Sequence, residues 1–509
     1  MSMADVEREP IVQTRLGKLR GGHERGTVVF RGIRFAQPPV GALRFRAPQP
    51  VQPWRGVRDA LTFAPVCPQA KSPLTDRKGE PEGDDCLALN VWTPALDGKR
   101  RPVMLWYHGG GFTNGSGSQP YYNGVTLAQH DVVVVTMNYR LGLLGFMDAE
   151  DFGPEYAGSG NCAVLDAVAA LQWVHDNIAA FGGDPKNVTI FGSSAGGVMV
   201  TQLLATPRAY PLFNRGIIQS GAFKLGRSQE VAKRSTRRFC KSAGIVYGDK
   251  VALQALSTQA ILDIANKGLA FTGPHTADQD PQDVGPVGFG PTTGDSVIPV
   301  SPDQVIAAKT GFKGDLMIGS CGDEFTMFVS PMTLGKAALD TSKMAPINGQ
   351  AAMLKMSVDD LYAAYRKFHP GMSDFDLRVR INSDAIVLMG QDLAEEYRNV
   401  NPRTYRYLFD WQSPVLAGAL GATHGMELSF EWGTFDTMRN FVGDSPPQAL
   451  ADRIQKAFVD FARTGKPGWK PWSGPGGELM RFDTVSTVGP DPFAEKAKFW
   501  KAAFPRVAT

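Results

Sequence analysis

A strand-like run that leads directly into a glycine-flanked serine constrains this chain more than any other feature. Residues 188–191 are β-branched and aromatic, a composition typical of a buried strand. The next five residues read Gly-Ser-Ser-Ala-Gly with Ser194 at the centre, and the apolar residues 198–205 can continue as a helix. A strand, a sharp turn and a helix in this order form a nucleophile elbow, whose strained turn exposes the serine hydroxyl. The alternative is a glycine-rich loop of the kind that any α/β protein can contain.

The residue types around Ser194 suit such an elbow. Gly192 and Gly196 allow the backbone to bend and allow the strand and the helix to pass closely. The first turn of a helix leaves backbone N–H groups unpaired, and that of Ala195 lies nearest to a negative oxygen formed beside Ser194.

A second glycine-rich loop supports this interpretation. The apolar residues 102–107 read as a strand and lead into His108 and three consecutive glycines, Gly109, Gly110 and Gly111. Without side chains, the N–H groups of such a loop can surround an anion, so we expect Gly110 and Gly111 to form an oxyanion hole with Ala195. A phosphate-binding loop is the alternative, but no Gly-Lys-Ser/Thr follows and the chain has no Gly-x-Gly-x-x-Gly.

Several further segments resemble one family. Residues 31–39 are similar to the "G-I-P-Y-A-x-P-P" segment, and residues 84–92 to the "E-D-C-L-x-L-N-V" segment, of type-B carboxylesterases. This family includes cholinesterases, carboxylesterases and bacterial para-nitrobenzyl esterases, and the other motifs of this chain follow in the family's order. The resemblance covers almost the whole chain. It implies an α/β-hydrolase fold, with a doubly wound, mostly parallel central sheet and helical insertions over an active-site gorge.

The pattern of the chain agrees with an α/β fold. Residues 131–140 form a continuous apolar strand, as expected for a parallel sheet covered on both faces, and residues 161–181 have helical spacing. Alternating strands and helices predict right-handed crossovers. No linker divides the chain, so we expect one domain over residues 1–509, with helical or loop insertions at about 227–309 and 330–400.

A serine nucleophile needs a general base, and the chain has only seven histidines. His424 lies in a glycine-flanked loop after a predicted strand at 404–411, where this fold places its histidine, and its surroundings resemble the family's "H-G-x-E" segment. Residues 319–324 follow a predicted strand at 315–318 and resemble "G-x-N-x-D-E-G". The resemblance implies that Glu324 orients His424, and Asp323 is the alternative acid.

The chain departs from the family pattern at three positions near this site. Cys321 replaces the asparagine of the acid segment, Phe325 replaces its last glycine, and Ser193 replaces the glutamate that usually precedes the nucleophile. A neutral residue at 193 removes a negative charge from the pocket floor, and no counterpart of a choline-stacking tryptophan is found. We therefore expect neutral, partly aromatic or medium-length acyl esters. Candidate residues for lining an apolar gorge, although aromatic residues are more often buried in a core, are Phe112, Tyr121, Tyr122, Phe223 and Phe325.

The resulting prediction is a serine carboxylesterase of EC class 3.1.1, which works through a Ser-His-Glu triad and an acyl-enzyme. A hydrolase of a carbamate or an aryl amide would use the same machinery. A catalytically inactive binding protein of the same fold is a more distant alternative.

Composition excludes other classes of function. Lys and Arg total 53, Asp and Glu total 50, and no basic run occurs, so nucleic-acid binding has no support. No apolar run of membrane-spanning length occurs, and residues 1–10 lack the pattern of a secretory signal. We expect a cytoplasmic monomer or weak homo-oligomer, or a secreted or periplasmic protein if a signal peptide has been removed.

The cysteines leave one question open. Cys67 and Cys86 match the first disulfide of secreted family members, but disulfides are rare in cytoplasmic proteins, so the resemblance leaves this pairing open. No Cys-x-x-Cys or His-Glu-x-x-His pattern suggests a metal site, and we expect neither a metal nor a cofactor.

Overall fold

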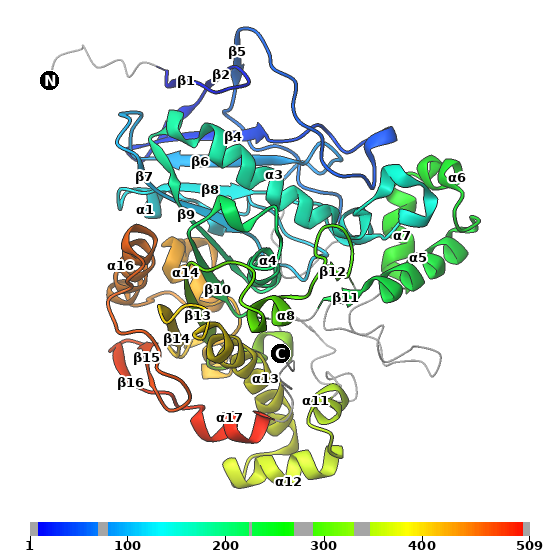
Figure 1. Cartoon of the computed structure of the whole chain (residues 1–509). Coiled ribbons are helices and arrows are strands. Elements are labelled where there is room, and N and C mark those ends of the chain that lie inside the picture. The colour runs from blue at the N-terminus through cyan, green and yellow to red at the C-terminus, as the bar shows by residue number, and fades with distance from the viewer. Residues whose placement is uncertain (1–8, 70–79, 223–225, 269–288, 330–346, 502–509) are drawn as a thin grey trace, which may run out of the picture.

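The computed structural model describes residues 9–69, 80–222, 226–268, 289–329 and 347–501, and it contains an 11-stranded sheet (Figure 1). Six neighbouring pairs, from β8 through β7, β9, β10, β13 and β14 to β15, are parallel, and the outer pairs at both edges are antiparallel. Across the sheet the strands are β16 (Thr487–Pro490), β15 (Glu478–Phe482), β14 (Thr404–Phe409), β13 (Asp315–Cys321), β10 (Arg215–Gln219), β9 (Gly183–Ser193), β7 (Arg101–Tyr107), β8 (Val133–Met137), β6 (Ala88–Thr93), β4 (Thr27–Arg34) and β3 (Gly22–Glu24).

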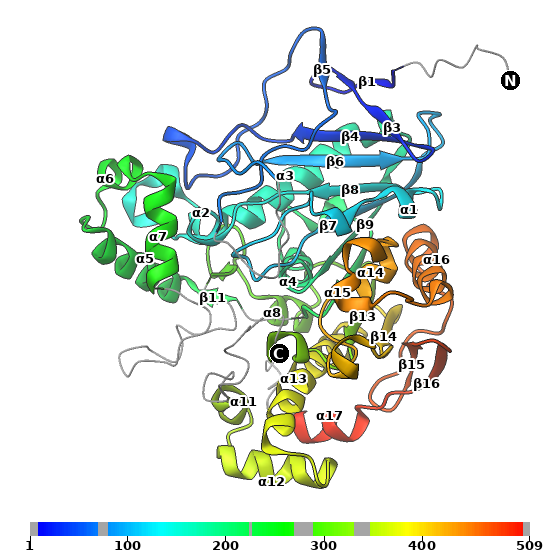
Figure 2. The same ribbon diagram turned by 180° about the vertical axis from the view of Figure 1, so that it is seen from behind.

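Both faces of this sheet are covered, which confirms the predicted doubly wound α/β class. Side chains of β7 alternate between two cores: Leu105 and Tyr107 belong to one, and Met104 and Trp106 to the other. Figures 1 and 2 view the sheet from opposite sides. The first face packs against α3 (Cys162–Asn177), α4 (Ala195–Leu203) and α13 (Asp374–Tyr397), and the second against α1 (Val125–Ala128), α14 (Glu427–Trp432) and α16 (Gln448–Thr464).

The predicted elements agree with the structure in type, and their ends differ by a few residues. The predicted strand at 131–140 is the shorter β8, because Asn138 and Arg140 leave the sheet to bind Gly117 and Asp166 with their side chains. The N-terminal residues 11–35 divide between two sheets. Only β3 and β4 join the main sheet, while a small sheet holds β1 (Ile11–Gln13), β2 (Lys18–Arg20) and β5 (Val57–Asp59).

The two expected insertions contain helices that lie on different sides of the molecule (Figures 1 and 2). Residues 227–309 include β11 (Arg227–Ser228), α5 (Gln229–Ala243), α6 (Lys250–Ala255), α7 (Thr258–Gly268), β12 (Thr292–Thr293) and α8 (Pro302–Ala307). Residues 330–400 include α11 (Asn348–Met353), α12 (Val358–Phe368) and α13. Other short α-helices among the described residues are α2 (Gly142–Phe146), α9 (Thr326–Val329), α15 (Arg439–Val442) and α17 (Ala494–Trp500). The single-domain organisation stays a prediction.

Within the described ranges, every helix is too short or too polar to cross a lipid bilayer.

Candidate active site

Ser194 occupies a strained turn between β9 and α4. Its backbone has φ of 57° and ψ of −124°, a combination that residues with a side chain rarely adopt. The turn is held from both sides, because the Ser194 N–H donates to the Gln219 carbonyl at 2.9 Å and the Ser194 carbonyl accepts from the Val198 N–H at 2.9 Å. The half-buried serine is therefore fixed at the carboxyl end of β9.

The glycines of the elbow are required by close backbone packing, as the sequence predicts. A Cβ atom added to Gly196 would lie 1.9 Å from the carbonyl oxygen of Tyr107, and one added to Gly192 would lie 2.5 Å from the Gly196 backbone. These distances leave no room for any side chain. The helix that follows Ser194 consequently packs directly against the end of β7.

The glycine loop after β7 lies against the nucleophile. A Cβ atom on Gly109 would lie 3.3 Å from the Ser194 Cβ, and Gly110 and Gly111 have φ of 108° and 61°. In the described part of the chain, no hydrogen bond takes the N–H groups of Gly110, Gly111 or Ala195 as donors. These three donors are thus available to a negatively charged oxygen at Ser194.

His424 and Glu324 form a buried pair. His424 Nδ1 lies 2.5 Å from Glu324 Oε2, and the second carboxylate oxygen accepts the Cys321 N–H at 2.8 Å. Glu324 is fully buried and His424 is 7% exposed. Because an ionised carboxylate only accepts hydrogen bonds, the imidazole proton belongs on Nδ1 and the lone pair on Nε2. That Nε2 has no hydrogen-bond partner among the described residues, so it is free to take a proton.

The topology brings these groups to one edge of the sheet. Ser194 follows β9, Glu324 follows β13, and the parallel strand β10 pairs with both β9 and β13. His424 lies in the loop between β14, the next parallel strand, and α14. Carboxyl ends of parallel strands are where open α/β sheets place their ligands.

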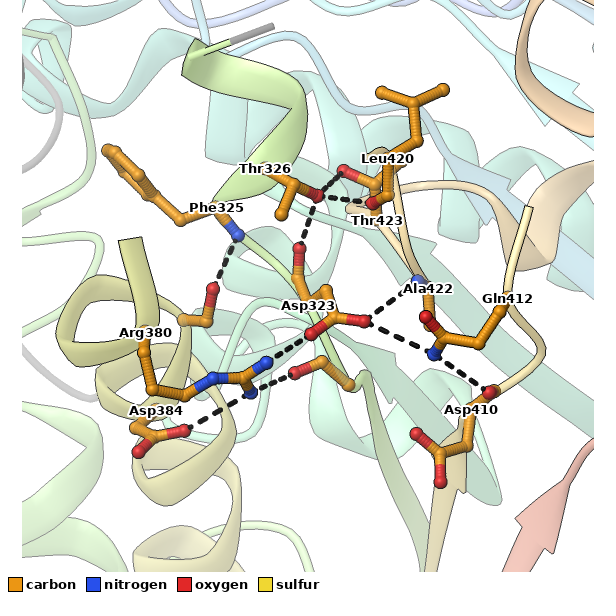
Figure 3. Close-up of polar contacts among 12 residues, drawn as sticks. Asp323, Phe325, Thr326, Arg380, Asp384, Asp410, Gln412, Leu420, Ala422 and Thr423 are labelled. Atoms are coloured by element: carbon orange, nitrogen blue, oxygen red, sulfur yellow. Dashed lines mark hydrogen bonds and ion pairs between the residues drawn. The ribbon is translucent and has the colours of Figure 1, made fainter. Parts of the chain in front are cut away.

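Asp323 has a different environment from Glu324, and Figure 3 shows the polar contacts of Asp323. Its carboxylate accepts the Ala422 N–H at 2.9 Å and the Gln412 side-chain amide at 3.2 Å, and it forms an ion pair with Arg380 of α13. Arg380 also donates to the Gly322 carbonyl at 3.0 Å. Asp323 therefore connects three segments: α13, the loop after β13 that contains Glu324 (the acid loop), and the loop that contains His424 (the histidine loop). Glu324, in contrast, contacts the imidazole.

A threonine pair adds a second connection between the same two loops (Figure 3). Thr326 Oγ1 lies 2.7 Å from Thr423 Oγ1 and 2.5 Å from the Leu420 carbonyl oxygen, and Thr423 Oγ1 accepts the Met327 N–H at 2.7 Å. These contacts position the acid loop beside the residue that precedes His424.

The family is shown by comparison with known proteins. The model of the carboxylesterase family matches residues 8–500. The chain belongs to this family. Its relatives include the para-nitrobenzyl esterase of Bacillus subtilis (strain 168), at 33% identity over 96% of this chain and 97% of that protein, and the phenmedipham hydrolase of Pseudarthrobacter oxydans, at 35% identity over 90% of both. A solved carboxylesterase of Geobacillus stearothermophilus superposes with a TM-score of 0.83, at 34% identity over 96% of this chain and 99% of that chain.

These matches confirm the predicted α/β-hydrolase fold and the activity class: the carboxylesterase is a carboxylic ester hydrolase of EC class 3.1.1. Para-nitrobenzyl esterase is also similar in structure, with a TM-score of 0.83 at 32% identity over 98% of this chain and 100% of the other.

The aromatic residues expected to line the gorge of the carboxylesterase differ in burial and in the rings that they contact. Phe112 is fully buried and packs against Phe146 at a centroid distance of 5.0 Å, so it belongs to the core. Phe223 lies outside the described residues. Phe325 is half-buried and its ring lies 5.3 Å from that of Phe328, which in turn lies 5.3 Å from the His424 ring. Phe328 was not predicted, and its position one helical turn after Glu324 is the only sequence signal for it.

The two candidate tyrosines also pack with aromatic neighbours. Tyr122 is buried against Trp106 and Trp432 at 4.9 and 5.5 Å, and the half-buried Tyr121 contacts Tyr122 edge-on at 4.5 Å. Only Tyr121 and Phe325 of the predicted set thus combine a described position with partial exposure.

The structure also shows the environments of His108, which precedes the glycine loop, and of the two cysteines considered for a disulfide. His108 is fully buried and stacked on Tyr139 at 4.2 Å, and burial lowers its pKa to about 4, so it is a neutral packing residue.

Cys67 and Cys86 are buried, unbridged thiols, and a hydrogen bond with Cys67, followed by burial, raises the pKa of Cys86. Whether these cysteines form a disulfide in the protein stays open. Among the described residues, no group of three or more His, Cys, Asp or Glu side chains is arranged to hold a metal ion.

Proposed function

We propose that the carboxylesterase hydrolyses neutral esters with Ser194 as nucleophile, His424 as general base and Glu324 as the orienting acid. The observation that carries this proposal is the 2.5 Å contact between His424 Nδ1 and the buried Glu324, which leaves Nε2 as an unpaired base. A serine on a strained turn at the same edge of the sheet completes the arrangement.

The mechanism follows from these positions. His424 Nε2 removes the proton of the Ser194 hydroxyl as its oxygen attacks the ester carbonyl, and the imidazolium then gives that proton to the departing alcohol. The N–H groups of Gly110, Gly111 and Ala195 stabilise the tetrahedral oxyanion. Water, activated by the same nitrogen, attacks the acyl-enzyme and releases the acid. Glu324 fixes the tautomer of His424 and stabilises its charged form.

The substrate class follows from the residues beside the nucleophile. Ser193, which directly precedes Ser194, is a neutral residue at 1% exposure, and its Oγ has no partner among the described residues. The half-buried ring of Phe328 offers apolar surface next to His424, and the half-buried ring of Phe325 packs against Phe328. We therefore propose neutral, partly apolar esters as substrates. A carbamate or aryl amide would fit the same machinery, and the phenmedipham hydrolase relative makes phenmedipham a second substrate to test.

The test measures turnover of two substrate sets. The first is a series of para-nitrophenyl esters of increasing acyl-chain length, and the second is one charged ester with its neutral isostere. We expect Ser194→Ala to abolish turnover of the whole series, while Ser235→Ala on the distant helix α5 serves as the matched control. Acetylcholine should be a poorer substrate than its neutral isostere 3,3-dimethylbutyl acetate. Efficient turnover of acetylcholine with poor turnover of the isostere would contradict the proposed specificity. The cytoplasmic location and the oligomeric state stay predictions.

A further inference from the structure

Two glutamates of helix α14 lie in the core directly behind the proposed site. Glu427 and Glu431 are one helical turn apart, so they face the same way, and their exposed fractions are 2% and 0%. Both accept a hydrogen bond from the same side-chain nitrogen: Gln219 Nε2 lies 3.1 Å from Glu427 Oε1 and 2.8 Å from Glu431 Oε2.

Within the described ranges, no positively charged side chain forms an ion pair with Glu427 or Glu431. The Tyr407 side chain, which interacts with Glu427, brings a neutral hydroxyl and no positive charge. The titratable groups that face the pair are Glu324, His424, Cys321, Tyr122 and Tyr407. Only His424 in this set can become positively charged.

Two carboxylates that share one amide donor in a dry site repel each other, and burial disfavours the charge of each. Burial, followed by the charge of Glu324, raises the pKa of Glu427 to about 7. Burial, opposed by the Gln219 hydrogen bond and reinforced by the charge of Glu427, raises the pKa of Glu431 well above its usual value. Both directions agree with the geometry, in which simultaneous ionisation is the unfavourable state.

The pair is connected to the catalytic residues at two points. Gln219, whose side chain holds both glutamates, accepts the Ser194 N–H with its backbone carbonyl at 2.9 Å. Glu427 follows His424 by three residues, and its carboxyl and the imidazole interact electrostatically. A change of charge on the glutamate pair therefore changes the stability of the His424 imidazolium.

We propose that Glu427 and Glu431 form a carboxyl dyad that retains one proton at neutral pH. Glu431 is the neutral acid, and Glu427 carries the one negative charge of the dyad, which adds to that of Glu324 in stabilising the imidazolium of His424. Both are positioning residues, since neither contacts the reacting atoms. This inference rests on the proposed role of His424 as general base.

The first test counts the proton by infrared difference spectroscopy between the native enzyme and Glu431→Gln at pH 7.5. We expect the variant to lose the carbonyl band of one protonated carboxylic acid. The exposed Glu478→Gln is the matched control and should lose carboxylate bands instead. Loss of carboxylate bands in Glu431→Gln would show that both members of the dyad are ionised and would overturn the proposal.

The second test follows the rate of inactivation by a neutral organophosphonate from pH 5 to 9. Removing a negative charge beside His424 makes its imidazolium less stable, so the acid limb of Glu427→Gln should move to lower pH. The expected shift is a few tenths of a unit, because Glu427, whose pKa is about 7, is only partly charged over this limb. Glu478→Gln should leave the limb in place. A limb that stays fixed or moves upward in Glu427→Gln would refute the dyad's action on the base.

The two tests separate failure of the dyad from failure of the proposed function. If the native enzyme shows no acid limb or no adduct on Ser194, the proposed catalytic residues are wrong. If the limb exists and Glu427→Gln leaves it unchanged, only the dyad is wrong. Should Glu427→Gln fail to fold, the infrared comparison of Glu431→Gln decides by itself.

Discussion

Replacing Glu324 by glutamine should remove most of the activity without disturbing the fold. Glu324 binds the Cys321 N–H with one oxygen at 2.8 Å and His424 Nδ1 with the other at 2.5 Å. In Glu324→Gln the amide oxygen would keep the Cys321 N–H, which turns the amide nitrogen, a donor, toward Nδ1. Nδ1 must then accept, so the proton moves to Nε2 and the base is blocked.

The expected loss is large because the wrong tautomer disables the base completely. Loss of the orienting acid in a serine triad costs on the order of 10⁴-fold in kcat. At about 1.36 kcal/mol per tenfold, this corresponds to about 5 kcal/mol of transition-state stabilisation. The assay is steady-state hydrolysis of para-nitrophenyl acetate, with circular dichroism to show that the variant is folded.

The neighbouring carboxylate provides the matched control. Asp323→Asn removes the charge that pairs with Arg380 but leaves the contact between Glu324 and His424 intact. Because one hydrogen bond contributes about 1 kcal/mol, we expect this variant to lose less than about tenfold in kcat. A greater loss of kcat in Asp323→Asn than in Glu324→Gln would refute the reasoning and would make Asp323 the orienting acid.

Three further predictions concern the framework. Gly196→Ala places a Cβ 1.9 Å from the Tyr107 carbonyl oxygen, so it should cost more than about 3 kcal/mol; a native-like urea midpoint would contradict this. Arg140→Met leaves the fully buried Asp166 without its cation and should cost about 3–5 kcal/mol in urea denaturation, and a cost below about 1 kcal/mol would argue against a coupled pair. Burial raises the pKa of Asp148 from 3.8 to about 6, so the unfolded chain ionises first and the native state loses stability as the pH rises from about 4 to 6. Asp148→Asn should therefore be more stable than the native enzyme by about 1–3 kcal/mol at pH 8 but not at pH 3.5, and thermal melting at both values checks this sign.

Local sequence patterns predicted which segments form strands and helices better than they predicted which strands pair with one another. The strand expected at 404–411 is β14, and the helical spacing at 161–181 contains α3, because alternation and helical spacing are properties of neighbouring residues. The extension of β9 back to Gly183 and the separate sheet of β1, β2 and β5 depend on segments distant in sequence. Such pairing leaves no local signal.

The same distinction applies to the site. Ser194 and His424 could be proposed as site residues because their glycine-rich surroundings are contiguous in sequence. Whether an aromatic residue is buried in the core, as Phe112 is, or half-buried near His424, as Phe328 is, depends on tertiary packing, which leaves no local signal. Glu431 could not be recognised, because a glutamate on a helix is usually exposed, whereas here it is fully buried.

The most direct test of the central claim is stoichiometric labelling with an organophosphonate ester, with the adduct located by peptide mass spectrometry. The account predicts one adduct per chain, on Ser194, and a loss of ester hydrolysis in proportion to labelling. An adduct on another residue that abolishes turnover, or full turnover by a chain labelled at Ser194, would contradict it.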